Sequence, residues 1–230
     1  TPSLLRPFSV GMFSPSQPRG KGAPRRIPRS TDSESFLVIG LGNPGPQYVG
    51  TRHNIGQMAL DELASRALPV PVTLSRHKKT NTDSAQMSLS SPTDSPVSII
   101  LGRPRSYMNL SGGPTFALAR FFHIPPRNII VLHDDLDLGF GAVRLKRGGG
   151  EGGHNGLRDI TKALGTKDYL RVRLGIGRPP GSMSPADFVL KKFSTRESTD
   201  VALMCSAAAD AVELLATQGL AYAQNTIHGR

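Results

Sequence analysis

His53 is the side chain of this 230-residue chain that is best suited to move a proton. Imidazole titrates near neutral pH, and His53 stands where a polar loop enters an expected helix. A carboxylate is needed to orient such a ring, and Asp134, at the end of an apolar run, is placed to do so. A lone histidine at a helix end more often makes a structural hydrogen bond, so the hypothesis of a general base depends on the His53–Asp134 pair.

Three asparagines stand at comparable places, each in a loop that follows an expected strand: Asn43, Asn109 and Asn155. An amide at such a place can donate to a carbonyl or an oxyanion and can accept from a peptide N–H. Each asparagine alone is more commonly a turn or helix-capping residue. The glycine run at 148–153 is either a flexible connector or a loop that brings backbone N–H groups close to a ligand.

Other kinds of site fit the sequence less well. The run at 40–45 lacks the third glycine and the acidic residue of a dinucleotide-binding fingerprint, and a Gly-x-Ser-x-Gly nucleophile elbow is absent. Metal binding is an alternative, but the spacing of the available ligands matches no metal signature. Those ligands are His53, His133, Asp134, Asp135 and His154. Asp135 and Asp137 are more simply explained as loop and solvent carboxylates.

The elements that must position these side chains alternate between strands and helices. Short apolar runs predict strands at 36–39, 97–102, 128–133, 142–146 and 169–176. Helical periodicity predicts helices at 54–67, 112–122, 155–164 and 197–217. Residues 75–96 are expected to form an exposed hairpin or loop. This order predicts an α/β fold, a single three-layer domain with a central mixed, largely parallel sheet flanked by helices. In such sheets ligands gather at the carboxyl ends of the strands, and polar clusters follow the expected strands at residues 40–54, 103–112, 133–137 and 148–156.

The positive charge of the chain is concentrated at its beginning. The formal net charge is +11, and residues 1–31 hold six basic side chains and no acid, which leaves 11 − 6 = +5 for residues 32–230. We expect residues 1–35 to be a disordered basic leader, followed by a catalytic domain at 36–230. The Arg- and Ser-rich, acid-poor leader is typical of a mitochondrial presequence, although its prolines oppose the usual amphipathic helix. A plain flexible tail and a cytoplasmic location are the alternative.

Composition narrows the class of protein. The basic balance favours an anionic partner such as nucleic acid. The apolar runs are far shorter than the roughly 18 residues that span a bilayer, so no membrane partner is expected. The single cysteine, Cys205, excludes an intramolecular disulfide and a cluster of thiolate ligands.

Four blocks of the sequence together resemble the bacterial-type peptidyl-tRNA hydrolase family, in its order and spacing. They are residues 40–54 (GLGNPGPQYVGTRHN), 107–112 (YMNLSG), 133–137 (HDDLD) and 148–157 (GGGEGGHNGL). The resemblance covers about residues 36–228 and is highly specific because four separate motifs agree. With the leader interpreted as a presequence, the chain would be a eukaryotic, mitochondrial member of the family.

The resemblance implies a function and a set of site residues. The family hydrolyses the ester bond between a peptide and the 3′-terminal ribose of tRNA, by a water that histidine activates, without metal or other cofactor. His53 and Asp134 match its catalytic histidine and supporting aspartate, and Asn43 matches a catalytic asparagine. Its substrate-binding residues match Tyr48, Tyr107, Met108, Asn109 and Asn155. Its tRNA-phosphate contacts match Lys146 and Arg173. The partner is then peptidyl-tRNA, and the protein is expected to be a monomer.

Some features depart from the family or leave rivals open. Asp135 replaces the usual glutamate, and Glu151 stands in the glycine loop where a carboxylate would weaken a phosphate contact. The segment at 75–96 departs most, so no function is assigned to it. One rival is a noncatalytic RNA-binding module that uses Arg144, Lys146, Arg171 and Arg173. Another is an amidohydrolase or a nucleoside-cleaving enzyme on a similar fold.

Overall fold

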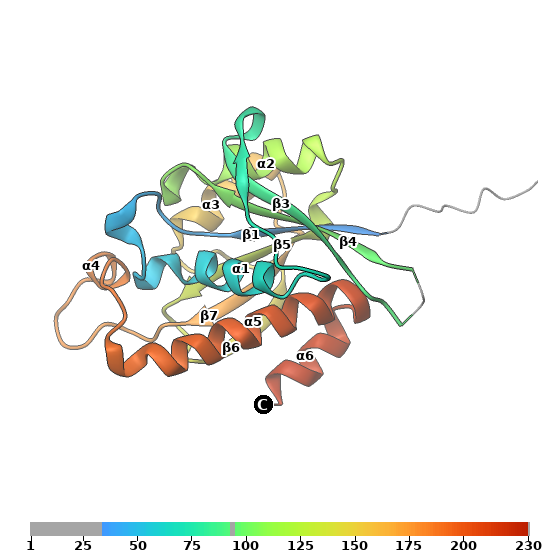
Figure 1. Cartoon of the computed structure of the whole chain (residues 1–230). Coiled ribbons are helices and arrows are strands. Elements are labelled where there is room, and N and C mark those ends of the chain that lie inside the picture. Colours follow the sequence, from blue (N-terminus) through green and yellow to red (C-terminus); the bar gives the residue numbers. More distant parts are fainter. Residues whose placement is uncertain (1–33, 93–94, 230) are drawn as a thin grey trace, which may run out of the picture. The chain divides into compact units, whose positions relative to one another are not determined.

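The computed structural model of the chain describes residues 34–92 and 95–229 (Figure 1). The expected leader therefore lies outside the described residues, apart from Glu34 and Ser35. The first strand begins at Ser35, the last residue assigned to that leader. The presequence interpretation of the leader stays a prediction.

A seven-stranded sheet forms the centre of the described part of the chain. Its strands are β1 (Ser35–Gly40), β2 (Ser75–His77), β3 (Thr82–Leu89), β4 (Val97–Pro104), β5 (Ile129–Asp135), β6 (Val143–Arg147) and β7 (Leu170–Gly175). They lie in the order β2-β3-β4-β1-β5-β7-β6. The central strands β4, β1, β5 and β7 are parallel, and the strands at both margins are antiparallel. The prediction of a mixed, largely parallel sheet is confirmed.

Helices cover both faces of this sheet, as Figure 1 shows. They are α1 (Ile55–Ser65), α2 (Gly112–Phe121), α3 (Asn155–Leu164), α4 (Pro185–Val189), α5 (Ser198–Gln218) and α6 (Leu220–His228). Successive side chains of β1 point to opposite faces. Leu37 packs in a core that contains Leu118 of α2, whereas Val38 packs in a core that contains Ala208 of α5. The two cores define the predicted three layers, with α2 and α3 on one side and α1, α5 and α6 on the other.

The segment at 75–96 contains the expected hairpin, formed by β2 and β3. It is less exposed than the sequence suggests, because β3 pairs with β4 along its whole length and buries Thr82 and Met87. Residues 93–94 lie outside the described part.

Two side chains of α6 cover the edge of β6. The Leu145 N–H donates to Nε2 of His228 at 2.9 Å, and Nε2 of Gln224 donates to the Leu145 carbonyl oxygen at 2.9 Å. Burial and the nearby Arg144 guanidinium lower the pKa of His228, which suits its role as an unprotonated acceptor. The helix thus takes the place of an eighth strand at this position. No helix in the described ranges is long and apolar enough to cross a membrane.

Gly56 sets the distance between α1 and the sheet, and its substitution tests that packing. A Cβ atom at this position would overlap the Leu132 carbonyl oxygen of β5 and the Leu41 amide, both of them backbone atoms. Because backbone cannot move aside cheaply, we predict that Gly56→Ala lowers the free energy of unfolding by about 1–3 kcal/mol in urea titrations. Gly113→Ala in α2, where the new methyl meets open space, is the control and should leave stability unchanged or slightly higher. Equal stability of both variants would contradict the close approach.

Candidate active site

The candidate site lies at the carboxyl ends of the parallel strands, where loops from three of them meet. Asn43 follows β1, Met108 follows β4, and Asp134 is near the end of β5. The loops are joined directly, because the Met108 N–H donates to Oδ1 of Asn43 at 2.8 Å. This is the edge at which ligands bind in α/β sheets.

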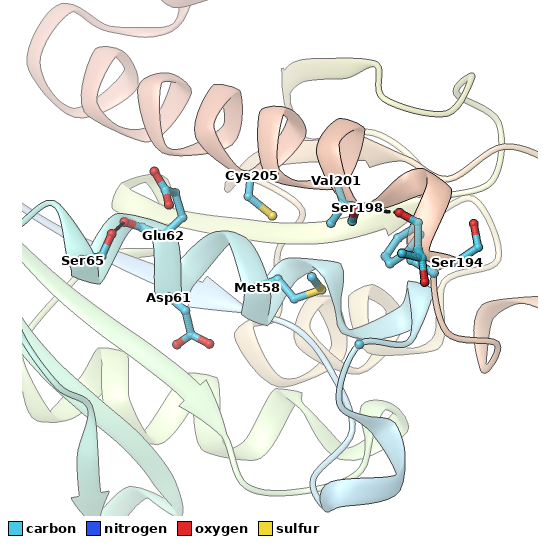
Figure 2. A pocket seen from close by; sticks show the side chains of 12 residues that line it. Met58, Asp61, Glu62, Ser65, Ser194, Ser198, Val201 and Cys205 are labelled. Atoms are coloured by element: carbon cyan, nitrogen blue, oxygen red, sulfur yellow. Dashed lines mark hydrogen bonds between the residues drawn. The ribbon is translucent and has the colours of Figure 1, made fainter.

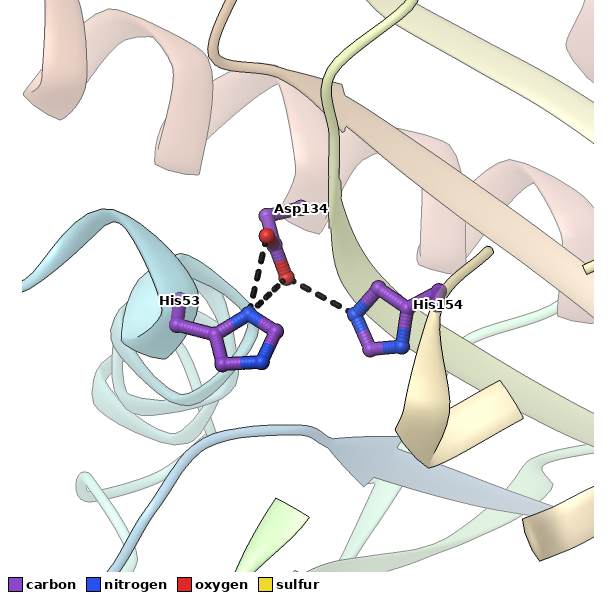
Figure 3. A group of neighbouring side chains, drawn as sticks. All are labelled: His53, Asp134 and His154. Carbon is purple, nitrogen blue, oxygen red and sulfur yellow. Dashed lines mark hydrogen bonds and ion pairs between the residues drawn. The ribbon is translucent and has the colours of Figure 1, made fainter. Parts of the chain in front are cut away.

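His53 and Asp134 face one another as the sequence predicts (Figure 3). His53 is in a short 3-10 helix, Arg52–Asn54, that leads directly into α1, and its Nδ1 lies 2.9 Å from each carboxylate oxygen of Asp134. An ionised carboxylate only accepts, so Nδ1 carries the ring proton and Nε2 is left as the basic nitrogen. Asp134 is 3% exposed. Burial acts to raise its pKa, but the two facing imidazoles outweigh burial and hold the pKa well below its usual range.

The second imidazole on Asp134 is His154, which sequence reasoning considered only as a metal ligand. Its Nε2 lies 2.8 Å from Oδ1 of Asp134, and its Nδ1 accepts the Leu157 N–H at 3.3 Å as the N-cap of α3. Because Nδ1 accepts, the ring proton is on Nε2 and is donated to Asp134. In the sequence, the signal for this role was the position of His154 directly before the first residue of an expected helix.

A third histidine, His133, lies beneath this pair and is 2% exposed. Its Nδ1 donates to the Asp134 carbonyl oxygen at 2.7 Å. Burial, together with the neighbouring His154, lowers the pKa of His133 to about 3, so its ring is neutral at physiological pH. His133 therefore supports the backbone that carries Asp134.

Asn43 is held by Asn54, a residue that the sequence did not single out. The Asn43 N–H donates to Oδ1 of Asn54, and Nδ2 of Asn54 donates to the Asn43 carbonyl oxygen, both at 2.9 Å. Oδ1 of Asn43 is already occupied by Met108. The amide nitrogen Nδ2 of Asn43 is therefore the group left to donate to a ligand.

The other expected substrate-binding residues differ in exposure, and Asn155 is the one of them that lines the cavity beside His53, whereas Asn43 lines a separate hollow. The rings of Tyr48 and Tyr107 meet edge to face with centroids 6.2 Å apart, and Tyr107 is 52% exposed. Met108 is buried, whereas Asn109 and Asn155 are exposed. Asn155 begins α3 and lines the same cavity as His53. In the described ranges no hydrogen bond fixes the Asn109 side chain, so it is free to turn toward a ligand.

A cavity of about 390 Å³ adjoins His53, His133 and His154. Its lining includes His53, Asp134, His154, Asn155, Pro185, Ala186 and Val189. A larger hollow of about 690 Å³ lies between α1 and α5, where Met58, Val201 and Cys205 are close to one another (Figure 2). That hollow has no imidazole in its lining, and its carboxylates Asp61 and Glu62 already bind Arg103 and Arg66. The smaller cavity is therefore the candidate active site.

Lys146 and Arg173, the expected phosphate contacts, lie on the neighbouring strands β6 and β7. Burial and the nearby guanidinium groups of Arg173 and Arg171 lower the pKa of Lys146. Nε of Arg173 donates to Oδ2 of Asp135 at 2.8 Å. The interpretation of Asp135 as a solvent carboxylate is therefore wrong, because the pairing of β5 with β7 brings it against Arg173. Asp137 is exposed as expected and pairs with Arg178.

Arg171 was grouped with the RNA-binding arginines, and the structure places it elsewhere. It is 1% exposed and donates to the carbonyl oxygens of Gly149 and Gly150 at 3.0 and 2.7 Å. Arg171 therefore supports the glycine loop from beneath. Glu151 in that loop lies 3.5 Å from Nζ of Lys167 and also lines the cavity.

Three of the five possible metal ligands, His53, Asp134 and His154, have their ligand atoms within 4.8 Å of one another. Both nitrogens that face Asp134 carry protons in the hydrogen-bonded arrangement. A metal ion at these nitrogens would have to displace both protons and, at His154, disturb the cap of α3. The geometry as it stands is that of a proton-handling network.

A histidine held by a buried carboxylate, with the amide of Asn155 lining the same cavity at the carboxyl edge of a parallel sheet, defines a hydrolase of the α/β class. Comparison with known proteins is more specific. The family model of peptidyl-tRNA hydrolase matches residues 37–230. The chain belongs to the peptidyl-tRNA hydrolase family.

Bacterial relatives and solved structures agree with this assignment. Peptidyl-tRNA hydrolase of Nocardia farcinica is 57% identical over 192 residues, which are 84% of this chain and 95% of the relative. That of Rhodococcus erythropolis is 57% identical over 196 residues, 85% of this chain and 99% of the relative. The crystal structure of peptidyl-tRNA hydrolase from Acinetobacter baumannii has a TM-score of 0.72 at 36% identity, covering 85% of this chain and 95% of that one.

His133 should make stability depend on pH. In the unfolded chain it binds a proton below about 6.5, whereas in the folded chain it stays neutral down to about 3, so unfolding takes up a proton between these values. We predict that the free energy of unfolding falls as pH is lowered from 6.5 to 4.5, and that His133→Asn removes up to about 1.4 kcal/mol per pH unit of that slope. Urea titrations at several pH values measure it. The exposed His123→Asn is the control, and an unchanged slope in His133→Asn would refute the assignment.

Proposed function

We propose that this protein hydrolyses the ester bond between a peptide, or an N-blocked aminoacyl group, and the 3′-terminal ribose of tRNA. Membership of the family supports the substrate class. The observation that carries the chemistry is the hydrogen bond from Nδ1 of His53 to the buried carboxylate of Asp134 at 2.9 Å. It leaves Nε2 of His53 as a base beside a cavity.

The reaction needs no covalent enzyme intermediate. Nε2 of His53 takes a proton from water while the water oxygen bonds to the ester carbonyl carbon, and the negative charge moves to the carbonyl oxygen. Asp134 stabilises the imidazolium that forms. The carbon–oxygen bond to the ribose then breaks, and His53 returns its proton to the 3′-oxygen. Free peptide and free tRNA leave.

Amide donors supply the charge stabilisation in this scheme. In this scheme Nδ2 of Asn43, whose Oδ1 already accepts the Met108 N–H, donates to the carbonyl oxygen or to the attacking water. Asn109, Tyr48, Tyr107 and Met108 border the peptide and the terminal adenosine, and Asn155 contacts the acceptor end. Lys146 and Arg173 bind phosphate of the tRNA. The protein acts as a monomer and without a metal ion.

Purified protein and an N-acetyl-aminoacyl-tRNA test this proposal directly. We expect release of the free N-acetyl amino acid and of intact tRNA, at the same rate with and without EDTA. Cleavage within the RNA, or binding without release, would overturn the proposed reaction. Loss of activity in EDTA that zinc restores would overturn the metal-free mechanism.

Removing the base should stop turnover without unfolding the protein. We predict that His53→Asn lowers kcat by about 10²–10⁴-fold and leaves the dissociation constant for tRNA nearly unchanged, because the ring acts in the chemistry. Asp134→Asn should lower kcat in the same direction but leave more activity. Single-turnover assays measure both, with the exposed His123→Asn as the control. A wild-type rate in His53→Asn would remove His53 from the mechanism.

Lys146 should act on binding rather than on chemistry. Its contact with phosphate is shared by the ground state and the transition state, so Lys146→Ala should raise KM with little change in kcat. The slope of log(kcat/KM) against the logarithm of the salt concentration should become shallower by roughly 0.7–0.9, as expected for the loss of one phosphate contact. Lys162→Ala, an exposed lysine near the end of α3, is the matched control. A defect confined to kcat would contradict a phosphate contact.

A further inference from the structure

The residue before the general base, Arg52, is a buried cation that packs on two aromatic rings. Its guanidinium carbon lies 4.6 Å from the ring centroid of Phe188 and 5.0 Å from that of Phe193. Only 11% of its side chain is exposed. A buried charge of this kind needs hydrogen-bond partners. The partners of Arg52 show which segments of the chain it joins.

The partners of Arg52 all come from a segment about 140 residues later in the chain. Nη2 donates to both carboxylate oxygens of Glu197, at 2.8 and 3.0 Å, and Nη1 donates to the Lys192 carbonyl oxygen at 2.7 Å. Glu197 also accepts the Ser194 N–H at 2.6 Å. These hydrogen bonds and Arg52 together lower the pKa of Glu197 despite its partial burial, so both members of the pair are charged.

Backbone bonds reinforce the same junction. The Arg52 N–H donates to the Lys191 carbonyl oxygen and the Phe193 N–H donates to the Gly50 carbonyl oxygen, both at 3.0 Å. Thr51 and Lys192 form an antiparallel bridge. Residues 50–52 and 191–193 are therefore paired as two short extended segments, and the Arg52 side chain closes the junction.

The junction joins two walls of the catalytic cavity. On one side, Arg52 is followed immediately by His53. On the other side, the paired segment follows α4, whose residues Pro185, Ala186 and Val189 line the same cavity as His53. Arg52 is therefore connected both to the base and to another part of the cavity lining.

We infer that Arg52 is a positioning residue, which through Glu197 and the 191–193 backbone sets the place of His53 relative to Asp134 and to the α4 wall. The kinetic part of this inference rests on the proposed function. Displacement of a reacting group by about 1 Å can cost roughly 10²-fold in rate even when the mutated residue is far from the chemistry.

The geometry requires arginine and not merely a positive charge. The guanidinium bonds a carboxylate and a carbonyl while its carbon lies over the rings of Phe188 and Phe193. A lysine ammonium keeps the charge but has neither a planar face to stack on the rings nor a fork to reach both oxygen groups. Arg52→Lys therefore removes the positioning and retains the electrostatics.

Arg66 offers a matched control in the same molecule. It follows the last residue of α1 and binds Glu62, Asp210 and Ser206, so it also ties α1 to α5, but at the end away from His53. Arg52→Lys and Arg66→Lys should both lower the melting temperature. Only Arg52→Lys should lower kcat, by about tenfold or more, with KM changed by less than about threefold. Glu197→Gln should also lower kcat, and it provides a second test of the inference if Arg52→Lys fails to fold.

A spectroscopic measurement separates positioning from stability alone. The proton on Nδ1 of His53 is bonded to a carboxylate and gives a downfield NMR signal, assigned by its absence in His53→Asn. We expect that signal to move or broaden in Arg52→Lys and Glu197→Gln and to stay in place in Arg66→Lys. Equal kcat and an unmoved signal in all three variants would overturn the inference. If the wild-type protein releases no peptide, the proposed function fails instead, and the NMR comparison still tests Arg52.

Discussion

The rest of the site depends on one buried carboxylate. Asp134 is almost completely removed from water and yet ionised, which is costly unless donors surround it. His53 and His154 supply those donors from opposite sides, at 2.9 and 2.8 Å. His53 lies in the segment that follows β1, and His154 stands at the start of α3. The carboxylate therefore fixes the relative position of two elements that are about a hundred residues apart in the sequence.

The same constraint explains why the site contains more histidine than a general base requires. His154 caps a helix with one nitrogen, and this fixes its proton on the nitrogen that faces Asp134. His133 stays neutral and bonds the Asp134 carbonyl oxygen. Within the described part of the chain, Nε2 of His53 is free beside the cavity, whereas Nε2 of His133 is buried without a partner. Hydrogen bonding and burial together give the three histidines different roles.

The fold and the central pair could be predicted from the sequence because both follow from local patterns. Apolar runs that alternate with helical periodicity imply a parallel sheet, and polar residues after the runs must then meet at one edge. What could not be predicted depends on strand order and on covering loops. Asp135 meets Arg173 only because β7 lies beside β5. Arg171 and Arg173 lie two residues apart on β7, so their side chains point to the same face of the sheet. The glycine loop at 148–153 covers Arg171, and no feature of β7 itself reveals this.

The way in which α6 covers β6 has a consequence for solubility. An open sheet edge presents unpaired N–H and C=O groups that can recruit a strand from another molecule. Here Gln224 and His228 satisfy both groups of Leu145 with side chains, so the last helix covers the edge of β6 at this residue without adding a strand. The acceptor is an imidazole nitrogen, and a proton on it turns this acceptor into a donor. Protonation of His228 would leave the Leu145 N–H without its acceptor and open this position of the β6 edge to pairing with another strand.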